Sequence, residues 1–396
     1  MDSHGALKGI KVLDLGRVLA GPYCAAIMAD LGADVIKIEE PGSGDDTRKF
    51  NPFVAGESAY FMQLNRNKRG ITLNLKKGKD IFLKLVEKAD IVVENFRPGT
   101  MKKLGLDYEE LRRVNPGIIY VAVSGFGQYG PYRDWPGYDL IAQGMSGLMS
   151  VTGWPGGDPT RAGTPVCDVM GGLTATIGVL AALQHRNMTG KGQMIDVALL
   201  DSAVSSLGTV SAIYLAEGKV PQRNGNAYES AAPLDSFRAN DGNFIIATGN
   251  DRMWQKLCDV MGQPELADME EFLTNYKRVQ NHEKLKRIIE EWSMTKTVDE
   301  LVPALLAAGV PAGPIYTIDK MAQDQHIANA RNMFAEIDHP IAGKVRLTNQ
   351  PIKMSELQTG IRASSPLLGQ HNEEVYMNEL HLSAEEIKTL REAGTI

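Results

Sequence analysis

The strongest candidate for chemistry in the chain is an aspartate at the start of a long apolar run. Asp168 lies between Ala162 and Gly172, and the pattern predicts a buried helix over residues 168–185. The amides and the dipole at a helix N-terminus stabilise an anion. Asp168 could therefore act as an ionised carboxylate nucleophile beside backbone N–H groups that hold an oxyanion. A helix-capping role is the alternative, and the spacing alone favours the cap.

A second feature is positive charge in the first third of an otherwise acidic chain. These cations follow predicted strands, at the edge where open α/β sheets bind their ligands. A polyphosphate such as a nucleotide or coenzyme A would suit this density of charge, although most charge runs form a solvated face. The cluster consists of Arg66, Lys68, Arg69, Lys76, Lys77, Arg97, Lys102 and Lys103.

A glycine-rich motif at residues 125–130 (GFGQYG) matches the nominal dinucleotide fingerprint and follows a predicted strand. In a dinucleotide site the last glycine opens a helix that holds the pyrophosphate. Pro131 and Pro136 are incompatible with such a helix, and no well-placed acidic residue ends a second strand. We therefore expect a glycine-rich turn here, and not a nicotinamide-dependent oxidoreductase.

Other catalytic classes lack their sequence motifs. The seven histidines are scattered, and no G-x-S-x-G motif of a serine hydrolase occurs. Cys24, Cys167 and Cys258 show no CxxC spacing, which argues against a disulfide scaffold or a structural zinc site. We therefore expect no metal centre, and the sparse cysteines suit a reducing cytoplasm.

The composition is that of a globular protein. The 396 residues are 43% hydrophobic and 23% charged, and the length suggests two to three domains. Lys and Arg number 42 against 48 Asp and Glu, and this net charge of −6 argues against general nucleic-acid or anionic-membrane binding. The first residues lack a basic stretch followed by an apolar run, so we expect no signal peptide.

Alternating strand and helix patterns must position these residues. The first two hundred residues predict an α/β fold with a mainly parallel sheet covered on both faces. The alternation of strands and helices ends after Gly218. Residues 224–243 have the composition of a loop, and within and beyond its end residues 237–247 predict a hairpin. Three or four predicted helices follow over 252–308. The predicted strands are 11–15, 34–38, 71–74, 90–94, 118–124, 193–198, 344–347 and 352–354, and the other helices are 20–31, 78–89, 202–215 and 383–393.

Seven short motifs, in order along the chain, resemble the class III coenzyme A-transferases, the family of formyl-CoA transferase and carnitine CoA-transferase. Each motif is weak alone, but their ordered combination is specific. The motifs are 7–15 (LKGIKVLDL), 20–22 (AGP), 31–42 (LGADVIKIEEPG), 64–69 (LNRNKR), 93–99 (VENFRPG), 136–139 (PGYD) and 189–193 (TGKGQ).

The resemblance implies a large Rossmann-like domain, a smaller α+β domain, and a homodimer of two subunits threaded as interlocked rings. The large domain would comprise residues 1–220 and 336–396, and the small domain residues 221–335. The catalytic aspartate of the family falls on Asp168, which reverses the preference for a cap. The implied coenzyme A-binding residues are Val18, Leu19, Leu73, Asn74, Lys76, Asn95, Phe96, Arg97, Lys103, Tyr138 and Asp139, with Glu40 at a position where some relatives carry Arg.

The implied reaction transfers coenzyme A from an acyl-CoA such as succinyl-CoA to a small organic acid, with no tightly bound cofactor. Asp168 would form a mixed anhydride and then an aspartyl-CoA thioester, and amides near Val169 and Met170 would stabilise the oxyanions. Tyr138 and Asp139 would line the acyl site, with Tyr138 donating a hydrogen bond to a substrate carboxylate or an intermediate.

Two departures bear on specificity. The formyl-CoA transferase branch has a run of glycines over its active site, which the stretch 225–233 lacks, and this argues against oxalate as acceptor. The α-methylacyl-CoA racemases of the same fold carry a catalytic histidine where Tyr138 stands. A phenol with a pKa of about 10 replaces imidazole poorly at neutral pH, so the transferase is favoured over the racemase. A non-catalytic coenzyme A-binding protein is a further alternative, and Asp168 argues against it.

Overall fold

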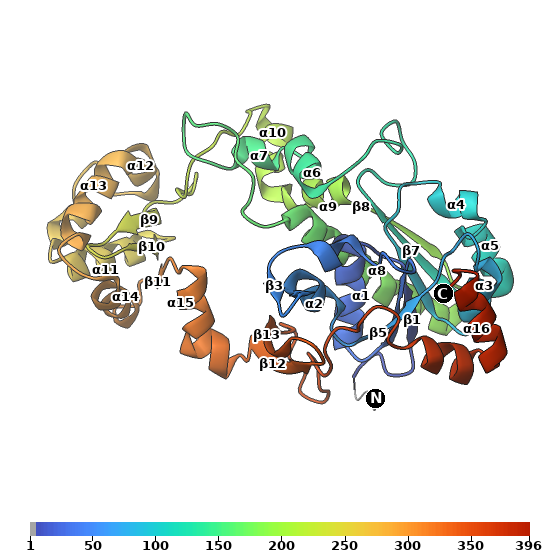
Figure 1. Cartoon of the computed structure of the whole chain (residues 1–396). Coiled ribbons are helices and arrows are strands. Elements are labelled where there is room, and N and C mark those ends of the chain that lie inside the picture. Colours follow the sequence, from blue (N-terminus) through green and yellow to red (C-terminus); the bar gives the residue numbers. More distant parts are fainter. Residues whose placement is uncertain (1–4) are drawn as a thin grey trace. The chain divides into compact units, whose positions relative to one another are not determined.

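The computed structural model describes residues 5–396, which form two compact units (Figure 1). The large unit comprises the chain up to Leu148, Arg161–Ala212 and Gln325–Ile396, and the small unit comprises Met149–Thr160 and Ile213–Asp324.

The large unit is built on a six-stranded parallel sheet with the strand order β5-β2-β1-β6-β7-β8. Val12 in the central strand β1 pairs with Val35 of β2 on one side and with Ile91 of β6 on the other. The predicted mainly parallel sheet is thus confirmed. Its strands are β1 (Lys11–Asp14), β2 (Asp34–Glu39), β5 (Lys68–Thr72), β6 (Ile91–Glu94), β7 (Ile119–Ser124) and β8 (Met194–Ala198).

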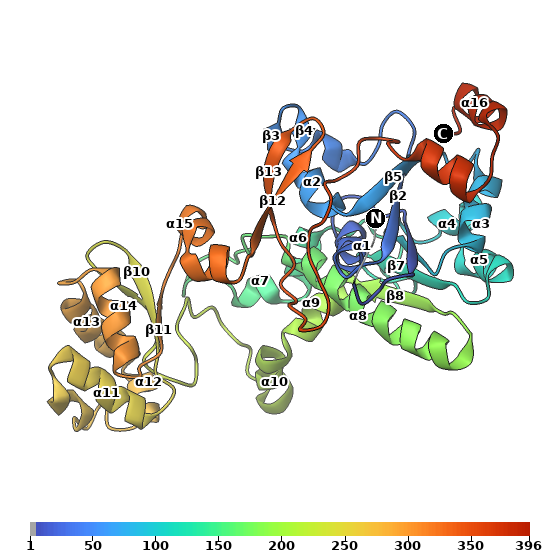
Figure 2. The same cartoon turned by 90° about the horizontal axis from the view of Figure 1, so that it is seen from below.

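Helices cover both faces of this sheet because successive strand residues point to opposite sides. Val12 packs into a core with α1 (Ala20–Asp30), α8 (Val166–Thr189) and α9 (Leu199–Ser206). Leu13 packs into a second core with α3 (Lys79–Glu87), α4 (Thr100–Leu104), α5 (Tyr108–Val114) and α16 (Ala384–Glu392). Figures 1 and 2 show α16, near the C-terminus, on the side of the sheet that carries α3 and α5.

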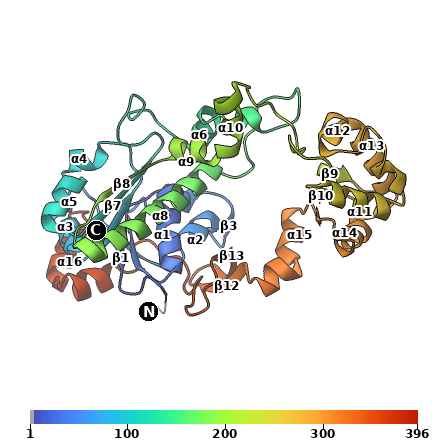
Figure 3. The ribbon, with the colours of Figure 1, turned by 180° about the vertical axis from the view of Figure 1, so that it is seen from behind.

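Two adjacent glycines let α8 lie close to its neighbours (Figure 3). A methyl group on Gly172 would lie 2.9 Å from the carbonyl oxygen of Ala20 in α1, and one on Gly171 would lie 2.6 Å from Leu199 in α9. Both distances are shorter than van der Waals contact. The Ala20 oxygen belongs to the backbone, so the packing of α8 against α1 requires glycine at residue 172, whereas a methyl group at residue 171 would require the Leu199 side chain to shift.

The small unit combines a three-stranded antiparallel sheet, of order β11-β10-β9, with helices around Trp254, Leu257 and Phe244. Strands β9 and β10 form the hairpin that the sequence predicts, and the expected group of helices is present. The elements are β9 (Leu234–Arg238), β10 (Asn243–Ala247), β11 (Ala312–Pro314), α11 (Asp251–Met261), η2 (Pro264–Ala267), α12 (Asn275–Gln280), α13 (His282–Ser293), α14 (Val298–Ala307) and α15 (Ile318–Gln323).

Two predictions about single elements are wrong. The helix expected over 202–215 is divided into α9 and α10 (Gly208–Glu217), because α9 ends before Leu207. The strand expected over 352–354 is an exposed, irregular segment after Pro351. The remaining elements are η1 (Asp46–Lys49), β3 (Phe53–Val54), β4 (Glu57–Ser58), α2 (Ala59–Asn65), α6 (Asp139–Met145), α7 (Leu148–Val151), η3 (Gln325–Ala330), β12 (Phe334–His339), β13 (Gly343–Thr348) and η4 (Glu374–Glu379).

Candidate active site

A cavity of about 420 Å³ opens at the carboxyl ends of β1, β2, β5 and β6. The chain places β2 and β5 on one side of β1 and then returns to place β6 on the other side. Such a reversal of strand order leaves a crevice beyond the strand ends, where open parallel sheets bind ligands. The cavity walls include Gly16, Arg17, Glu40, Ser43, Leu73, Asn74, Leu75, Lys76, Phe96 and Leu104.

The structure brings several of the expected coenzyme A-binding residues together at this cavity. Leu73, Asn74, Lys76 and Phe96 line it, as does Glu40, whose carboxylate accepts a hydrogen bond of 2.6 Å from the Asn74 amide. The other expected residues of this region lie in segments that adjoin the lining. They are Val18 and the buried Leu19 after Arg17, Asn95 and the exposed Arg97 beside Phe96, and the exposed Lys103 beside Leu104.

Three of the eight cations in the expected cluster pair with carboxylates of the large unit. The fully buried Lys68 pairs with Asp14 at 2.8 Å, and the buried Arg66 pairs with Asp30 at 2.6 Å. Arg69 pairs with Asp34 at 2.6 Å. These three cations neutralise carboxylates within the large unit, so their assignment to a polyphosphate site is wrong. The exposed cations of the cluster are Lys76, Lys77, Arg97, Lys102 and Lys103.

The wall of the cavity contains a strained turn directly after β1. Val18 has a φ of 63°, in the left-handed region that a β-branched side chain rarely occupies. Such a conformation costs about 1–3 kcal/mol and persists only where the surroundings hold it. Among residues 5–396, the other non-glycine residues with positive φ are Ala55, Asn67, Asn332 and His381, none of them β-branched.

Asp168 is the third residue of α8 and does not cap it. The helix begins at Val166, and the capping carboxylate comes from Asp139 at the start of α6. One oxygen of Asp139 accepts from the amides of Cys167, at 2.8 Å, and Asp168, at 3.4 Å, and the other accepts from Gln143 at 2.6 Å. The capping alternative for Asp168 is therefore wrong, because Asp139, 29 residues earlier, takes that role. The Asp139 carboxylate thus faces the start of α8, and its place in the acyl site remains a prediction.

The first-turn amides of α8 are already engaged. The amide of Val166 donates to Thr164 at 2.8 Å, and that of Val169 donates to Pro165 at 3.1 Å. Together with the two amides on Asp139, these contacts leave no free oxyanion donor among residues 166–169 of the described helix. The expectation concerned the amides near Val169 and Met170, and the Val169 amide is already bonded to the Pro165 carbonyl.

The environment of Asp168 also differs from the one expected. Burial and the neighbouring Asp139 carboxylate raise the pKa of Asp168 from 3.8 to about 7. The helix dipole was expected to keep this carboxyl ionised, but desolvation and like-charge repulsion outweigh it. A carboxyl with such a pKa is present in both protonation states near neutral pH, and perturbed groups of this kind concentrate at functional sites.

Tyr60 in α2 belongs to the same cluster, and sequence reasoning missed it. Burial and the charges of Asp168, Asp45 and Asp139 raise the pKa of Tyr60 to about 12. Asp45 lines the cavity, so Tyr60 lies within electrostatic range of both the cavity wall and Asp168. No motif around Tyr60 indicates this, because the electrostatic interaction depends on how α2 packs in the large unit.

The motif at 125–130 is a turn, as predicted. Gly127 and Gly130 have φ values of 85° and 92°. A methyl group on Gly125 would lie 2.5 Å from the Cα atom of Gly137, so these glycines allow two backbone segments to meet before α6. Tyr138, immediately before α6, is 70% exposed.

Across residues 5–396, no group of three or more His, Cys, Asp or Glu residues is arranged to hold a metal ion.

The chain is similar in sequence and fold to proteins of a known family. The family described as CoA-transferase family III matches residues 7–372. Acetyl-CoA:oxalate CoA-transferase of Acetobacter aceti is 44% identical over 354 residues, covering 89% of this chain and 90% of the relative. Succinyl-CoA:glutarate CoA-transferase of Mus musculus is 38% identical over 398 residues, covering 100% and 91%. The crystal structure of a CAIB/BAIF family protein from Brucella suis superposes with a TM-score of 0.86 at 41% identity, covering 95% of this chain and 100% of that one.

Proposed function

This chain belongs to CoA-transferase family III, which confirms the resemblance of its motifs, and we propose that it transfers coenzyme A between carboxylic acids through covalent intermediates on Asp168. It is a CoA-transferase, and what we propose beyond this is its nucleophile, its substrates and its assembly. The observation that carries the choice of nucleophile is the partly buried Asp168 carboxyl in the first turn of α8, with its raised pKa.

The proposed reaction proceeds in four acyl transfers. The Asp168 carboxylate attacks the donor thioester, which releases coenzyme A thiolate and leaves a mixed anhydride. The thiolate attacks the aspartyl carbonyl, so the donor acid departs and an aspartyl-CoA thioester remains. The acceptor carboxylate then attacks this thioester, and the released thiolate takes the acceptor acyl group from the second anhydride. Asp168 is regenerated as a carboxylate, and each step replaces one acyl bond with another.

The surroundings of Asp168 support this chemistry. A poorly solvated carboxylate is a better nucleophile than one in bulk water, and its pKa of about 7 keeps a substantial ionised fraction at neutral pH. Tyr60 stays a neutral phenol, because its pKa is raised to about 12, and it can donate a hydrogen bond to an oxygen of an intermediate. With no free first-turn amide at residues 166–169, a side-chain donor such as Tyr60 is the better candidate for this role.

We assign the cavity at the strand ends to coenzyme A. Leu73, Phe96 and Leu104 offer apolar walls to an adenine ring or a pantetheine arm, and Arg17 and Lys76 offer charge to phosphates. The assignment of Arg97 and Lys103 as further phosphate partners remains a prediction from the resemblance, supported by their exposure beside the cavity walls.

We further propose that two copies assemble, as the interlocked homodimer that the resemblance implies. Support comes from α8, the one helix among residues 5–396 that is long and apolar enough to cross a membrane. Its outer face leaves Ile177 and Met188 68% and 70% exposed, with Leu173 and Leu180 also exposed. Exposed large apolar side chains gathered on one helix indicate an interaction surface. Sedimentation analysis tests this: a monomeric wild-type protein would contradict it.

The substrates are proposed from chemistry and relatives together. The two relatives named above carry oxalate and glutarate in their names, and one from Haloarcula marismortui is named succinyl-CoA:mesaconate CoA-transferase. We propose an acyl-CoA such as succinyl-CoA as donor and a small dicarboxylic acid as acceptor. The stretch 225–233 argues against oxalate, whereas the 44% identity to the oxalate relative makes oxalate an acceptor to include in the assay. A cytoplasmic location remains a prediction.

Intact-protein mass spectrometry tests the proposal. Wild-type protein is incubated with succinyl-CoA and quenched with hydroxylamine or borohydride, and Asp168→Ala is treated identically. We expect a trapped adduct in the wild type only, mapped to the peptide that contains Asp168. Absence of an adduct with several acyl-CoAs would contradict the covalent mechanism. Exchange of the α-proton of an acyl-CoA into deuterated water would then support a racemase instead.

A further inference from the structure

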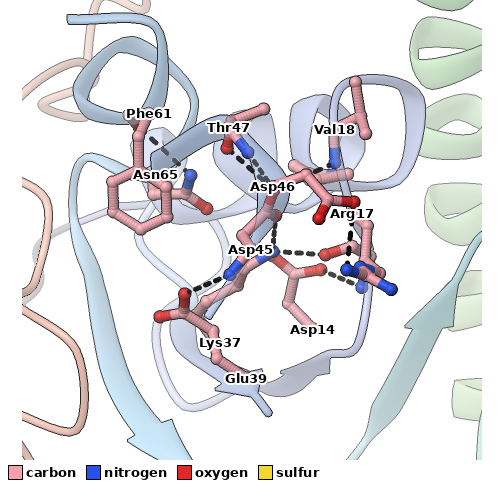
Figure 4. A network of polar contacts seen from close by, with 12 residues as sticks. Asp14, Arg17, Val18, Lys37, Glu39, Asp45, Asp46, Thr47, Phe61 and Asn65 are labelled. Atoms are coloured by element: carbon pink, nitrogen blue, oxygen red, sulfur yellow. Dashed lines mark hydrogen bonds and ion pairs between the residues drawn. The ribbon is translucent and has the colours of Figure 1, made fainter. Parts of the chain in front are cut away.

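The strained turn Gly16–Val18 is held through its backbone by side chains from other strands and loops (Figure 4). The Arg17 amide donates to the side-chain oxygen of Asn95 at 2.7 Å, and the Asn95 amide group donates back to the Arg17 carbonyl at 2.8 Å. The Val18 amide points to Asp45, at 3.4 Å. These contacts fix the two peptide groups that precede the strained residue, Gly16–Arg17 and Arg17–Val18.

Asp45 is the centre of these contacts. One of its oxygens faces Val18 and also accepts from the amide and hydroxyl of Thr47, at 2.9 and 2.8 Å. The other pairs with the buried Lys37 ammonium at 2.8 Å, and Lys37 donates in turn to the Gly16 carbonyl. Although burial opposes ionisation, Lys37 and the hydrogen bonds from Thr47 hold the pKa of Asp45 well below its usual range.

The cavity shows what this arrangement achieves. Gly16, Arg17, Lys37 and Asp45 all line it, so the turn and the groups that hold it form one wall. Glycine would adopt the left-handed conformation of residue 18 without strain. The chain instead carries valine and maintains its conformation with buried charge, which makes the shape of the wall depend on Asp45.

We propose that Asp45 is a positioning residue that holds the Gly16–Val18 turn in its left-handed conformation and so preforms the coenzyme A cavity. This inference rests on the proposed function, since it assumes that the cavity binds coenzyme A. Asp45 acts through Val18 and Lys37 and does not take part in the acyl transfers at Asp168. A preformed wall favours binding because the ligand does not have to order it.

Asp45→Asn tests the proposal because asparagine keeps the size of the side chain and one acceptor oxygen but loses its charge. Without the pair to Lys37, Val18 relaxes toward negative φ and the wall shifts. We expect the dissociation constant of free coenzyme A, measured by calorimetry, to rise about tenfold. The turnover number at saturating acyl-CoA should fall by a smaller factor than the affinity for coenzyme A, because Asp168 is untouched.

The decisive measurement is a cycle with Val18→Gly. Glycine holds a positive φ without help, so Asp45→Asn should weaken binding by less than about threefold in the Val18→Gly background. An equal loss in both backgrounds would overturn the proposal, because a charge effect on the ligand or a general loss of stability would not depend on residue 18. The matched control is Asp46→Asn, whose exposed pair with Arg17 at 3.0 Å should contribute little, leaving binding within twofold.

Further outcomes separate the possible failures. If wild-type protein binds coenzyme A and Asp45→Asn binds it within twofold, the positioning role is wrong while the proposed function stands. If the wild type does not bind coenzyme A, the proposed function is wrong and this inference falls with it. Should Asp45→Asn fail to fold, Thr47→Val removes one hydrogen bond from the same oxygen of Asp45, and the same cycle with Val18→Gly then decides.

Discussion

Replacing Asp168 with asparagine should stabilise the protein at alkaline pH, although it abolishes the nucleophile. The carboxyl has a pKa of about 7 in the folded chain, against 3.8 without the surrounding structure. Between these values the folded chain retains a proton that the unfolded chain has released, so stability falls as pH rises and the whole cost is present above pH 7. At ~1.4 kcal/mol per pH unit, the upper limit of this cost is about 4 kcal/mol.

The expected gain is smaller than this limit, because the Asp168 side chain keeps some contact with water. We expect Asp168→Asn to raise the free energy of unfolding by about 1–3 kcal/mol at pH 8 and to match the wild type near pH 4. The unfolding midpoint should rise by roughly 2–6 °C at pH 8.

Circular dichroism during chemical denaturation, repeated at several values between pH 4 and pH 8.5, measures this difference. Asp201→Asn, at an exposed position of α9, is the control, because substitutions of exposed side chains change stability little. An Asp168→Asn variant that is less stable than the wild type at pH 8, or a difference that does not vary with pH, would refute the reasoning.

Three other predictions follow from the same packing. Asp139→Asn removes the charge that repels the Asp168 carboxylate, so the acidic limb of the pH profile of kcat/KM should move down by roughly one pH unit. Initial rates from pH 5 to 9 measure this shift, and an acidic limb at the wild-type pH would contradict the prediction. Lys68→Met leaves the buried Asp14 without its ammonium and should cost about 3–5 kcal/mol in denaturant unfolding, part of which an added Asp14→Asn should restore. Gly172→Ala places a methyl group 2.9 Å from a carbonyl oxygen of α1. Thermal unfolding should therefore show a loss of about 1–3 kcal/mol in the free energy of unfolding, despite the higher helix propensity of alanine. A more stable variant would show that α1 and α8 are not in close contact.

The sheet could be predicted because its information is local. Strands such as 91–94 and 119–124 consist almost entirely of β-branched and other apolar residues, which is typical of parallel strands buried on both faces. Asp168 could be identified from its place before an apolar run and from the motifs of the family. The turn at 125–130 was recognisable because Pro131 and Pro136 exclude the alternative helix.

The details of the site could not be predicted in this way. Lys68 has the same residue type as the exposed Lys76, and only its buried partner Asp14, 54 residues earlier, removes it from a ligand site. The capping role of Asp139 arises across 28 residues between α6 and α8, and Tyr60 joins the cluster only through tertiary packing.

The sequence by itself therefore determined the class of fold, the family and the residue that is the proposed nucleophile, because periodicity and motif order are properties of neighbouring residues. Only the tertiary structure decided which cations are neutralised, which carboxylate caps α8 and in which direction the pKa of Asp168 moves. These outcomes depend on desolvation and on Coulomb interactions between groups distant in sequence, whose strength is set by burial and separation in space.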